Sequence, residues 1–180
     1  MRARFFRGLL SLLEVRMPSL FRRIQLQVLM NITADAFQIK ALRLWQKIPE
    51  RALEEYAAFT KTCMENHHVE SARMYRLAYD VGSRLRRVTG FSEKTDLQRM
   101  VFLLYRNIGI TMRGELPGCV TVSACYFSRV YTPAQCKMIS AMDSGIVAGI
   151  YGGGQLIFTG RLTEDCDCCT ACLKGETKDA

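Results

Sequence analysis

The residues with the most chemistry to offer are cysteines, and four of them lie in the segment TEDCDCCTACLK near the C-terminus. Cys166 and Cys169 are spaced as C-x-x-C, and so are Cys169 and Cys172. A structural zinc site normally combines two separated pairs of this kind, and a second separated pair is missing from the sequence. Cys166, Cys168 and Cys169 are therefore candidate ligands of zinc or iron only if the fold adds further thiols. A disulfide, a nucleophile or packed strands would use the same residues differently.

Cys136 is the thiol with the best independent argument for reactivity. A helix is predicted to begin beside it, with Thr132 as the N-cap and Pro133 at the first helical position. Gln135 completes a capping box. Cys136 then lies in the first helical turn next to Lys137, and both features favour the thiolate. A small buried apolar side chain is the equally weighted alternative.

Asp143 follows Cys136 by seven residues, inside the apolar run MISAMDSGIVAGI. A carboxylate there must be paired or kept for proton transfer, because burying it unpaired is costly. The alternative is that Asp143 caps a second helix that begins at Ser144. We predict that Cys125, Cys136, Asp143 and at least one tail thiol line one pocket, because the strand CVTVSACYF ends just before this helix.

The elements that position these residues change character near Gly109. Apolar residues recur at helical spacing over residues 19–30, 33–47, 51–68, 70–88 and 94–108. Residues 110–173 read instead as strands, with a turn at Pro117-Gly118, one helix ending at the glycines 152–154, and a last hairpin. This predicts an α+β fold, in which a helical N-terminal region (1–109) packs on a C-terminal antiparallel sheet (110–180) crossed by one helix. The two regions are expected to form one compact domain.

The last hairpin has its own prediction. Aspartate favours turns, so the sequence EDCD is expected to place Cys166 in the turn. Cys168 or Cys169 then begins the return strand, and Cys172 is expected to be mainly a packing residue.

The composition describes an ordinary globular chain of 180 residues, with 49% hydrophobic and 23% charged residues. The net charge of +8 is concentrated in residues 1–51, which contain ten Lys and Arg against three Asp and Glu. A solvated helix face and a nucleic-acid surface would both use such charge. Since no zinc finger or RNA-recognition signature accompanies it, we predict no nucleic-acid partner.

The first seventeen residues, MRARFFRGLLSLLEVRM, combine an apolar side with arginines. They could make weak contact with a membrane surface, although docking on the protein's own core is commoner. No cleavage site follows, and no apolar run is long enough for a transmembrane segment. We therefore expect a cytoplasmic location, where thiols stay reduced, and do not interpret the eight cysteines as a disulfide framework.

The C-terminal segments C-Y-F, Y-T-P-A-Q-C, M-D-S-G and L-I-F-T-G-R-L-T-E-D-C-D-C-C occur in this order over roughly residues 105–173. In this order they resemble the L-2-amino-thiazoline-4-carboxylic acid hydrolase-like family. The resemblance implies a small-molecule substrate whose thiazoline-type ring is opened: water adds at the ring carbon, and the C–S bond breaks to give a carbamoyl-cysteine.

The resemblance also implies roles for particular residues. Asp143 would act as the base, and Cys136 as the acid or nucleophile, with Cys125 as a third catalytic residue. Arg161 would bind the substrate carboxylate, and Tyr131 would contact the substrate.

Two extra tail thiols, Cys168 and Cys172, depart from the family pattern and leave a metal-assisted variant open. The terminal hairpin is also distantly similar to the end of vinyl-reductase-type ligand-binding domains. The alternative function is therefore a cysteine-rich module that binds or senses a small ligand or a metal without catalysis.

Overall fold

Long helices make up the first half of the chain, in a computed structural model that describes residues 3–8, 18–67 and 69–175. These helices are α2 (Pro18–Phe37), α3 (Pro49–Asn66), α4 (Ser71–Thr89) and α5 (Lys94–Asn107). Prolines at the start of α2 and α3 suit the first helical turn, where no backbone donor is needed. As predicted, α4 ends at Gly90, whose φ of 68° is left-handed.

The helix predicted over residues 33–47 was wrong. The chain stays in α2 as far as Phe37, and Gln38 then adopts a φ of 58°, after which residues 38–48 are not helical. The side chain of Gln27 holds this loop: its Oε1 accepts a hydrogen bond from Leu44 N at 2.6 Å, and its Nε2 donates to Leu42 O at 2.9 Å. Side-chain bonding of this kind leaves no trace in the hydrophobic periodicity.

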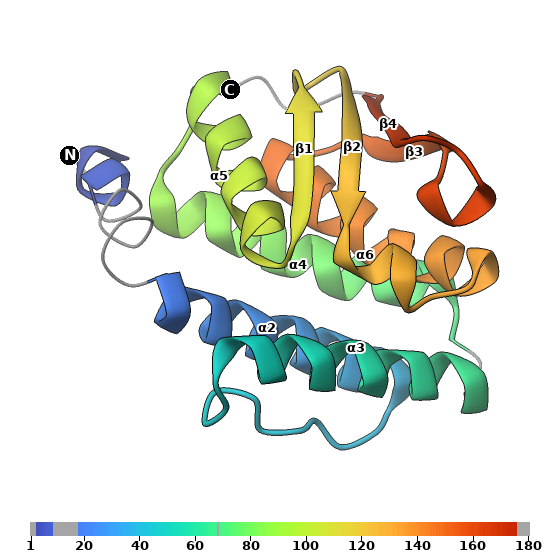
Figure 1. The fold of residues 1–180 in the computed structure, drawn as a ribbon. Helices are drawn as coiled ribbons and strands as arrows, with labels where there is room; N and C mark the ends of the chain where they lie inside the picture. Colours follow the sequence, from blue (N-terminus) through green and yellow to red (C-terminus); the bar gives the residue numbers. More distant parts are fainter. Residues whose placement is uncertain (1–2, 9–17, 68, 176–180) are drawn as a thin grey trace.

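The second half of the chain forms a four-stranded antiparallel sheet in the order β1-β2-β4-β3. Its strands are β1 (Ile110–Gly114), β2 (Cys119–Cys125), β3 (Gln155–Gly160) and β4 (Cys169–Lys174). The cysteine-rich tail thus becomes an inner strand between β2 and β3. Helix α6 (Pro133–Tyr151) connects β2 to β3 and crosses behind the sheet (Figure 1). The predicted α+β fold is confirmed, and buried residues of both regions belong to one hydrophobic cluster.

Helix α6 is continuous and packs closely on α4. It begins with the predicted capping box of Thr132 and Gln135. A Cβ atom added at Gly149 would lie 2.3 Å from the carbonyl oxygen of Tyr79, so glycine lets the two backbones touch. Because α6 runs unbroken from Pro133 to Tyr151, Asp143 lies in mid-helix and does not cap a second one.

Two short 3-10 turns replace strand ends that the sequence predicted to be longer. The turn η1 (Tyr126–Arg129) follows β2, and η2 (Leu162–Glu164) follows β3. Each turn contacts the other, and η2 also contacts α6. They bring residues that follow the strands to the N-terminal half of α6.

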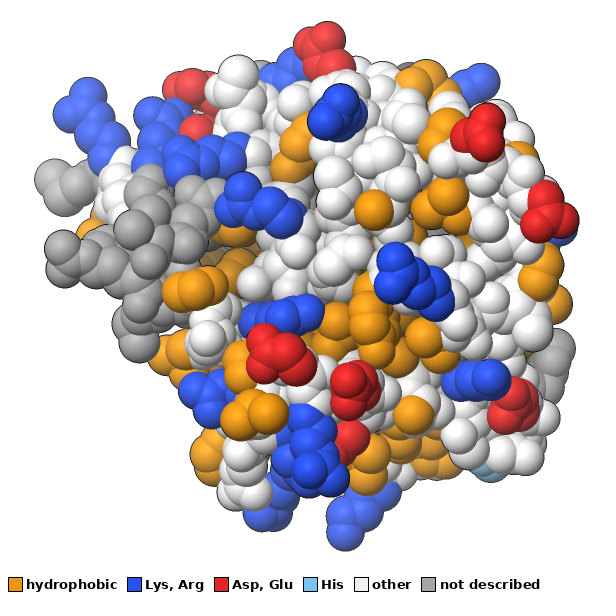
Figure 2. All heavy atoms as spheres, viewed as in Figure 1, with side chains coloured by type: hydrophobic (Ala, Val, Ile, Leu, Met, Phe, Trp, Pro, Cys, Tyr) orange, Lys and Arg blue, Asp and Glu red, His pale blue; other side chains and the backbone are white. Residues whose placement is uncertain are grey.

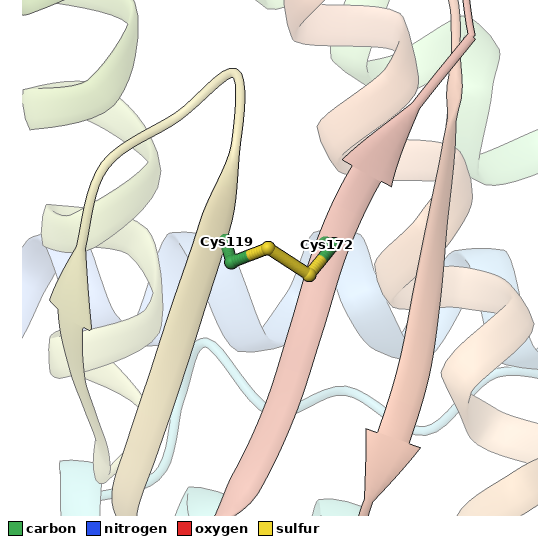
Figure 3. The surroundings of a disulfide bond; sticks show 2 residues. All are labelled: Cys119 and Cys172. Carbon is green, nitrogen blue, oxygen red and sulfur yellow. A yellow bond between two sulfur atoms is a disulfide. The ribbon is translucent and has the colours of Figure 1, made fainter.

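The tail hairpin follows its prediction in part. Cys166 lies exposed in the turn region before β4, and Cys169 begins the return strand. Cys172, however, faces Cys119 across the β2–β4 pair and forms a disulfide with it on the more exposed face of the sheet (Figure 3). The predictions that all thiols are reduced and that Cys172 mainly packs were therefore wrong for this pair. Spacing alone does not give the register that sets the two residues opposite each other.

Only part of the N-terminal stretch is described. Residues 3–8 are helical, Phe6 packs against the hydrophobic cluster, and Arg7 Nε donates to Asp96 of α5 at 2.8 Å. The remainder of residues 1–17, for which we predicted weak membrane-surface contact, lies outside the described residues. None of the described helices has the length and hydropathy needed to cross a membrane.

Candidate functional site

A cavity of about 460 Å³ lies among α2, α4, α5, α6 and the two 3-10 turns. This volume is in the range of small-molecule sites. Figure 2 shows hydrophobic side chains gathering where α2 and α3 meet the elements above them. The apolar lining includes Phe21, Ile24, Val28, Val81, Leu85 and Val88.

Helix α6 supplies one wall of this cavity from a single face. Five of its residues line the cavity: Cys136, Ile139, Met142, Asp143 and Ile146. The last four follow Cys136 by three, six, seven and ten residues, and this spacing places all five on one side of a helix. At 1.5 Å per residue the stripe is about 15 Å long. Cys136 lies at the N-terminal end of the stripe and Asp143 in the middle of the helix, and the apolar Ile146 follows Asp143 by about one turn.

Asp143 is the carboxyl group of this cavity. It is partly buried within a dense shell of protein atoms and lines the cavity. Burial raises the pKa of Asp143 to about 6, while the hydrogen bond from Tyr105 and the charge of Arg161 act in the opposite direction. A carboxyl group with this pKa can exchange a proton near neutral pH.

Tyrosine hydroxyls surround the carboxyl group. Tyr105 Oη donates to Asp143 Oδ1 at 3.0 Å, and Tyr56 Oη donates to the sulfur of Met142 at 3.7 Å. Burial raises the pKa values of Tyr105 and Tyr131 well above the ordinary range, so both stay protonated and remain donors. Tyr131 Oη is buried and makes no hydrogen bond of good geometry in the described part of the chain, although Thr60 lies near enough to oppose the rise of its pKa.

Three thiols share the cavity with Asp143: Cys125, Cys136 and Cys169. The structure thus brings together the residues that the sequence predicted to converge. Burial raises the pKa of Cys125 to about 12, so its thiol stays neutral and does not act as a thiolate nucleophile at neutral pH. Burial likewise raises the pKa of Cys169, whose sulfur accepts a hydrogen bond from Leu162 N at 3.2 Å.

The cation beside Cys136 is not the one that the sequence suggested. Lys137 forms an ion pair with Glu164 at 2.8 Å. Arg161 lies beside the thiol, with its Nη1 atom 3.9 Å from Cys136 Sγ. The position of Cys136 in the first turns of α6 agrees with the prediction, whereas the identity of its charged neighbour depends on how β3 and η2 pack.

Arg161 is held in place by other residues of the protein. It is buried, its Nη1 atom donates to Ser140 Oγ at 2.6 Å, and its guanidinium carbon lies 4.4 Å from the ring centre of Phe158. The residue is not part of the cavity wall. This geometry does not support the predicted role of Arg161 as a clamp for a substrate carboxylate, whereas the predicted substrate contact Tyr131 does line the cavity.

The predicted metal ligands of the tail do not converge. Cys166 is exposed in the turn, Cys168 lies 4.0 Å from the hydroxyl of Thr170, and Cys169 is buried toward the cavity. Cys168 lies in the bend before β4, whereas Cys169 is the first residue of that strand. Within residues 3–8, 18–67 and 69–175, no three His, Cys, Asp or Glu side chains are placed to hold a metal ion. These thiols are therefore not assembled as the zinc or iron site that the sequence suggested.

Tyr105 and Thr163 are among the cavity residues that the sequence analysis missed as site residues. Tyr105 lies on the inward face of α5, where its phenol was expected only to pack, and Thr163 lies in η2, where a strand was expected. A tyrosine on an apolar helix face is a signal that could have been used, because its hydroxyl needs a buried partner. No comparable signal marks Thr163.

Comparison of the chain with protein-family models, with curated proteins and with solved structures finds no match. The resemblance to the thiazoline-carboxylate hydrolases therefore remains a prediction.

Proposed function

We propose that this protein binds a small, mainly apolar molecule in the central cavity, with the polar part of the ligand at Asp143. The observation that carries the proposal is a carboxyl group on the wall of an otherwise largely apolar cavity. Such a group is costly to keep there, and perturbed carboxyl groups in cavities are concentrated at functional sites. The proposal corresponds to the non-catalytic alternative that the sequence left open.

Protection of Cys136 from alkylation tests this proposal. Benzyl alcohol, which combines an apolar ring with a hydroxyl, is expected to occupy the cavity and to cover the Cys136 thiol. At ten times its Kd it should slow the reaction of Cys136 with N-ethylmaleimide about tenfold. Peptide mass spectrometry measures this rate alongside that of Cys166, an exposed thiol outside the cavity. Equal rates for Cys136 with and without saturating benzyl alcohol would contradict the proposal.

A second candidate function is the hydrolysis of a thiazoline-type ring, which the resemblance implies. The observation in its favour is the pKa of about 6 at Asp143, which suits a general base near neutral pH. Cys136 lies on the same wall of the cavity. Arg161 is engaged by Ser140, so the cation that could meet the anionic carboxylate of such a substrate is Arg84, which lines the cavity.

The hydrolytic function predicts turnover of 2-amino-thiazoline-4-carboxylate to a carbamoyl-cysteine, measured by chromatography of the product. Replacing Asp143 with Asn should then reduce the rate by about 100-fold or more, since a general base contributes on this scale. A Cys166→Ala variant serves as the control and should keep the rate. Product formation that is equal in the Asp143→Asn variant would remove Asp143 from the mechanism.

A further inference from the structure

We infer that the ligand is a single-chain amphiphile whose uncharged head group both donates and accepts hydrogen bonds, as an alcohol or a primary amide does. The inference rests on the proposed binding function and specifies its ligand class. Two features carry it: a mainly apolar arm that leads from the carboxyl group to the surface, and buried hydroxyl groups of cavity-lining residues that make no hydrogen bond within the described part of the chain.

The apolar arm continues the cavity beyond the last polar residue of α6. A Cβ atom added at Gly82 would lie 2.3 Å from the carbonyl oxygen of Ile146, so α4 lies beside α6 at this point. From there Val81, Leu85 and Val88 form one stripe on α4. The stripe covers about 10 Å at the rise of a helix.

The opposite side of the arm is formed by α2. Ile24 and Val28 line the cavity there, while Ile24 and Val88 are 52% and 58% exposed. Large apolar side chains at this exposure mark the rim, so the arm opens to solvent between α2 and the end of α4. Arg84 and Gln25 also line the cavity, but its wall is mainly apolar, and a channel of this kind closed inside by Asp143 fits a hydrocarbon chain with a polar end.

The hydroxyls of Tyr131 and Thr163 indicate the chemistry of that polar end. Both oxygens are buried and belong to residues that line the cavity, and neither makes a hydrogen bond among the described residues, although Thr60 lies near enough to Tyr131 to act on its pKa. Tyr131 as a whole is only 6% exposed. An unpartnered buried hydroxyl is unfavourable, so these two groups are expected to donate to an acceptor atom of the ligand.

Asp143 requires a hydrogen-bond donor from the ligand. Its carboxylate can only accept hydrogen bonds, and Tyr105 is the residue seen to donate to it within the described chain. The ligand should therefore supply a donor as well as an acceptor. A hydroxyl or a primary amide provides both, whereas an ammonium group only donates and a carboxylate only accepts. A carboxylate would in addition be repelled by Asp143.

Calorimetric titration of the full chain with primary alcohols tests the inference at pH 7.5. From butanol through hexanol to octanol, the affinity should rise about fourfold for each added methylene, the value expected for burial of that group. Octanoate should bind at least about tenfold more weakly than octanol, because its charge faces Asp143.

Two tryptophan variants of α2 locate the tail. Val28 and Leu20 are 37% and 36% exposed, but of the two only Val28 lines the cavity. Val28→Trp should reduce the increase in affinity for each added methylene, while the matched control Leu20→Trp should leave this increase unchanged. Tyr131→Phe should weaken every alcohol by a similar factor, about twofold to tenfold for one neutral hydrogen bond.

The outcomes separate this inference from the function on which it rests. If the affinity for alcohols does not depend on their chain length but is reduced in Tyr131→Phe, the inference that the ligand is an amphiphile is wrong, while binding at Asp143 still stands. Equal effects of the two tryptophan variants, or octanoate binding as well as octanol, would also overturn the inference. If no alcohol binds and benzyl alcohol does not protect Cys136, both the inference and the binding function are wrong.

Discussion

Replacing Cys119 and Cys172 together with alanine is expected to lower the free energy of unfolding by about 4 kcal/mol. The disulfide joins residues that are 53 positions apart. A cross-link over a loop of this length restricts the unfolded chain, and that restriction is the main source of its stabilising effect in the chain-entropy description. The bond also connects β2 to the inner strand β4, which is the last described strand of the chain.

Urea denaturation at pH 7.5, with and without a phosphine reductant, measures this effect. The reductant should destabilise the unmodified protein as much as the double substitution does, and it should have no further effect on the double variant. Cys166→Ala is the control, because that thiol is free and exposed, and a change within about 0.5 kcal/mol is expected for it. A reductant effect of the same size in the double variant would assign the loss to another cause.

The Asp143→Asn variant is expected to be more stable than the unmodified protein at pH 7.5, by up to about 3 kcal/mol. Burial raises the pKa of Asp143 from 3.8 to about 6, so the folded protein binds this proton more tightly than the unfolded chain does. Between about pH 4 and pH 6 the unfolded state therefore loses the proton first, and stability falls as the pH rises. Asparagine cannot ionise, and it retains an oxygen that can accept from Tyr105.

The pH dependence identifies the carboxyl group as the cause. The stability difference between Asp143→Asn and the unmodified protein should be close to zero at pH 4 and should grow through pH 6 to a plateau. Urea denaturation at several pH values measures it, with Asp80→Asn as the control on the exposed face of α4. A difference that is the same at pH 4 and pH 7.5 would contradict this explanation.

The same substitution should weaken the proposed site. Protection of Cys136 by benzyl alcohol is expected to decrease in Asp143→Asn, because the amide is a weaker acceptor than a carboxylate. A residue whose replacement stabilises the fold and impairs binding is typical of a functional group held at a cost to stability.

Local chemistry was sufficient to predict most of the elements. Pro133 with the Thr132 and Gln135 capping box defined the start of α6, and Gly90 defined the end of α4. Each signal acts within a few residues, through backbone groups that a nearby side chain satisfies or a backbone angle that glycine permits. The helix expected over residues 33–47 failed because Gln27, more than ten residues away, binds the loop.

The candidate site, too, was predictable only in part. The spacing of Cys136 and Asp143 placed both on one helical face, since seven residues make two turns, and a carboxylate in an apolar run stood out for its cost of burial. The partners of these residues come from distant segments: Tyr105 from α5, Arg161 after β3, and Tyr131 after η1. Spacing along the chain carries no information about such contacts.

The sequence by itself therefore determined most of the helices and strands, the α+β class and two residues of the cavity wall, Cys136 and Asp143. Tertiary structure alone decided the strand order that makes the cysteine tail an inner strand, the register that pairs Cys119 with Cys172, and the engagement of Arg161 by Ser140. The physical reason is the distance along the chain over which each effect acts. Capping, turns and periodicity act over neighbouring residues, whereas register, burial and the pKa of Asp143 are set by packing between segments far apart in the chain.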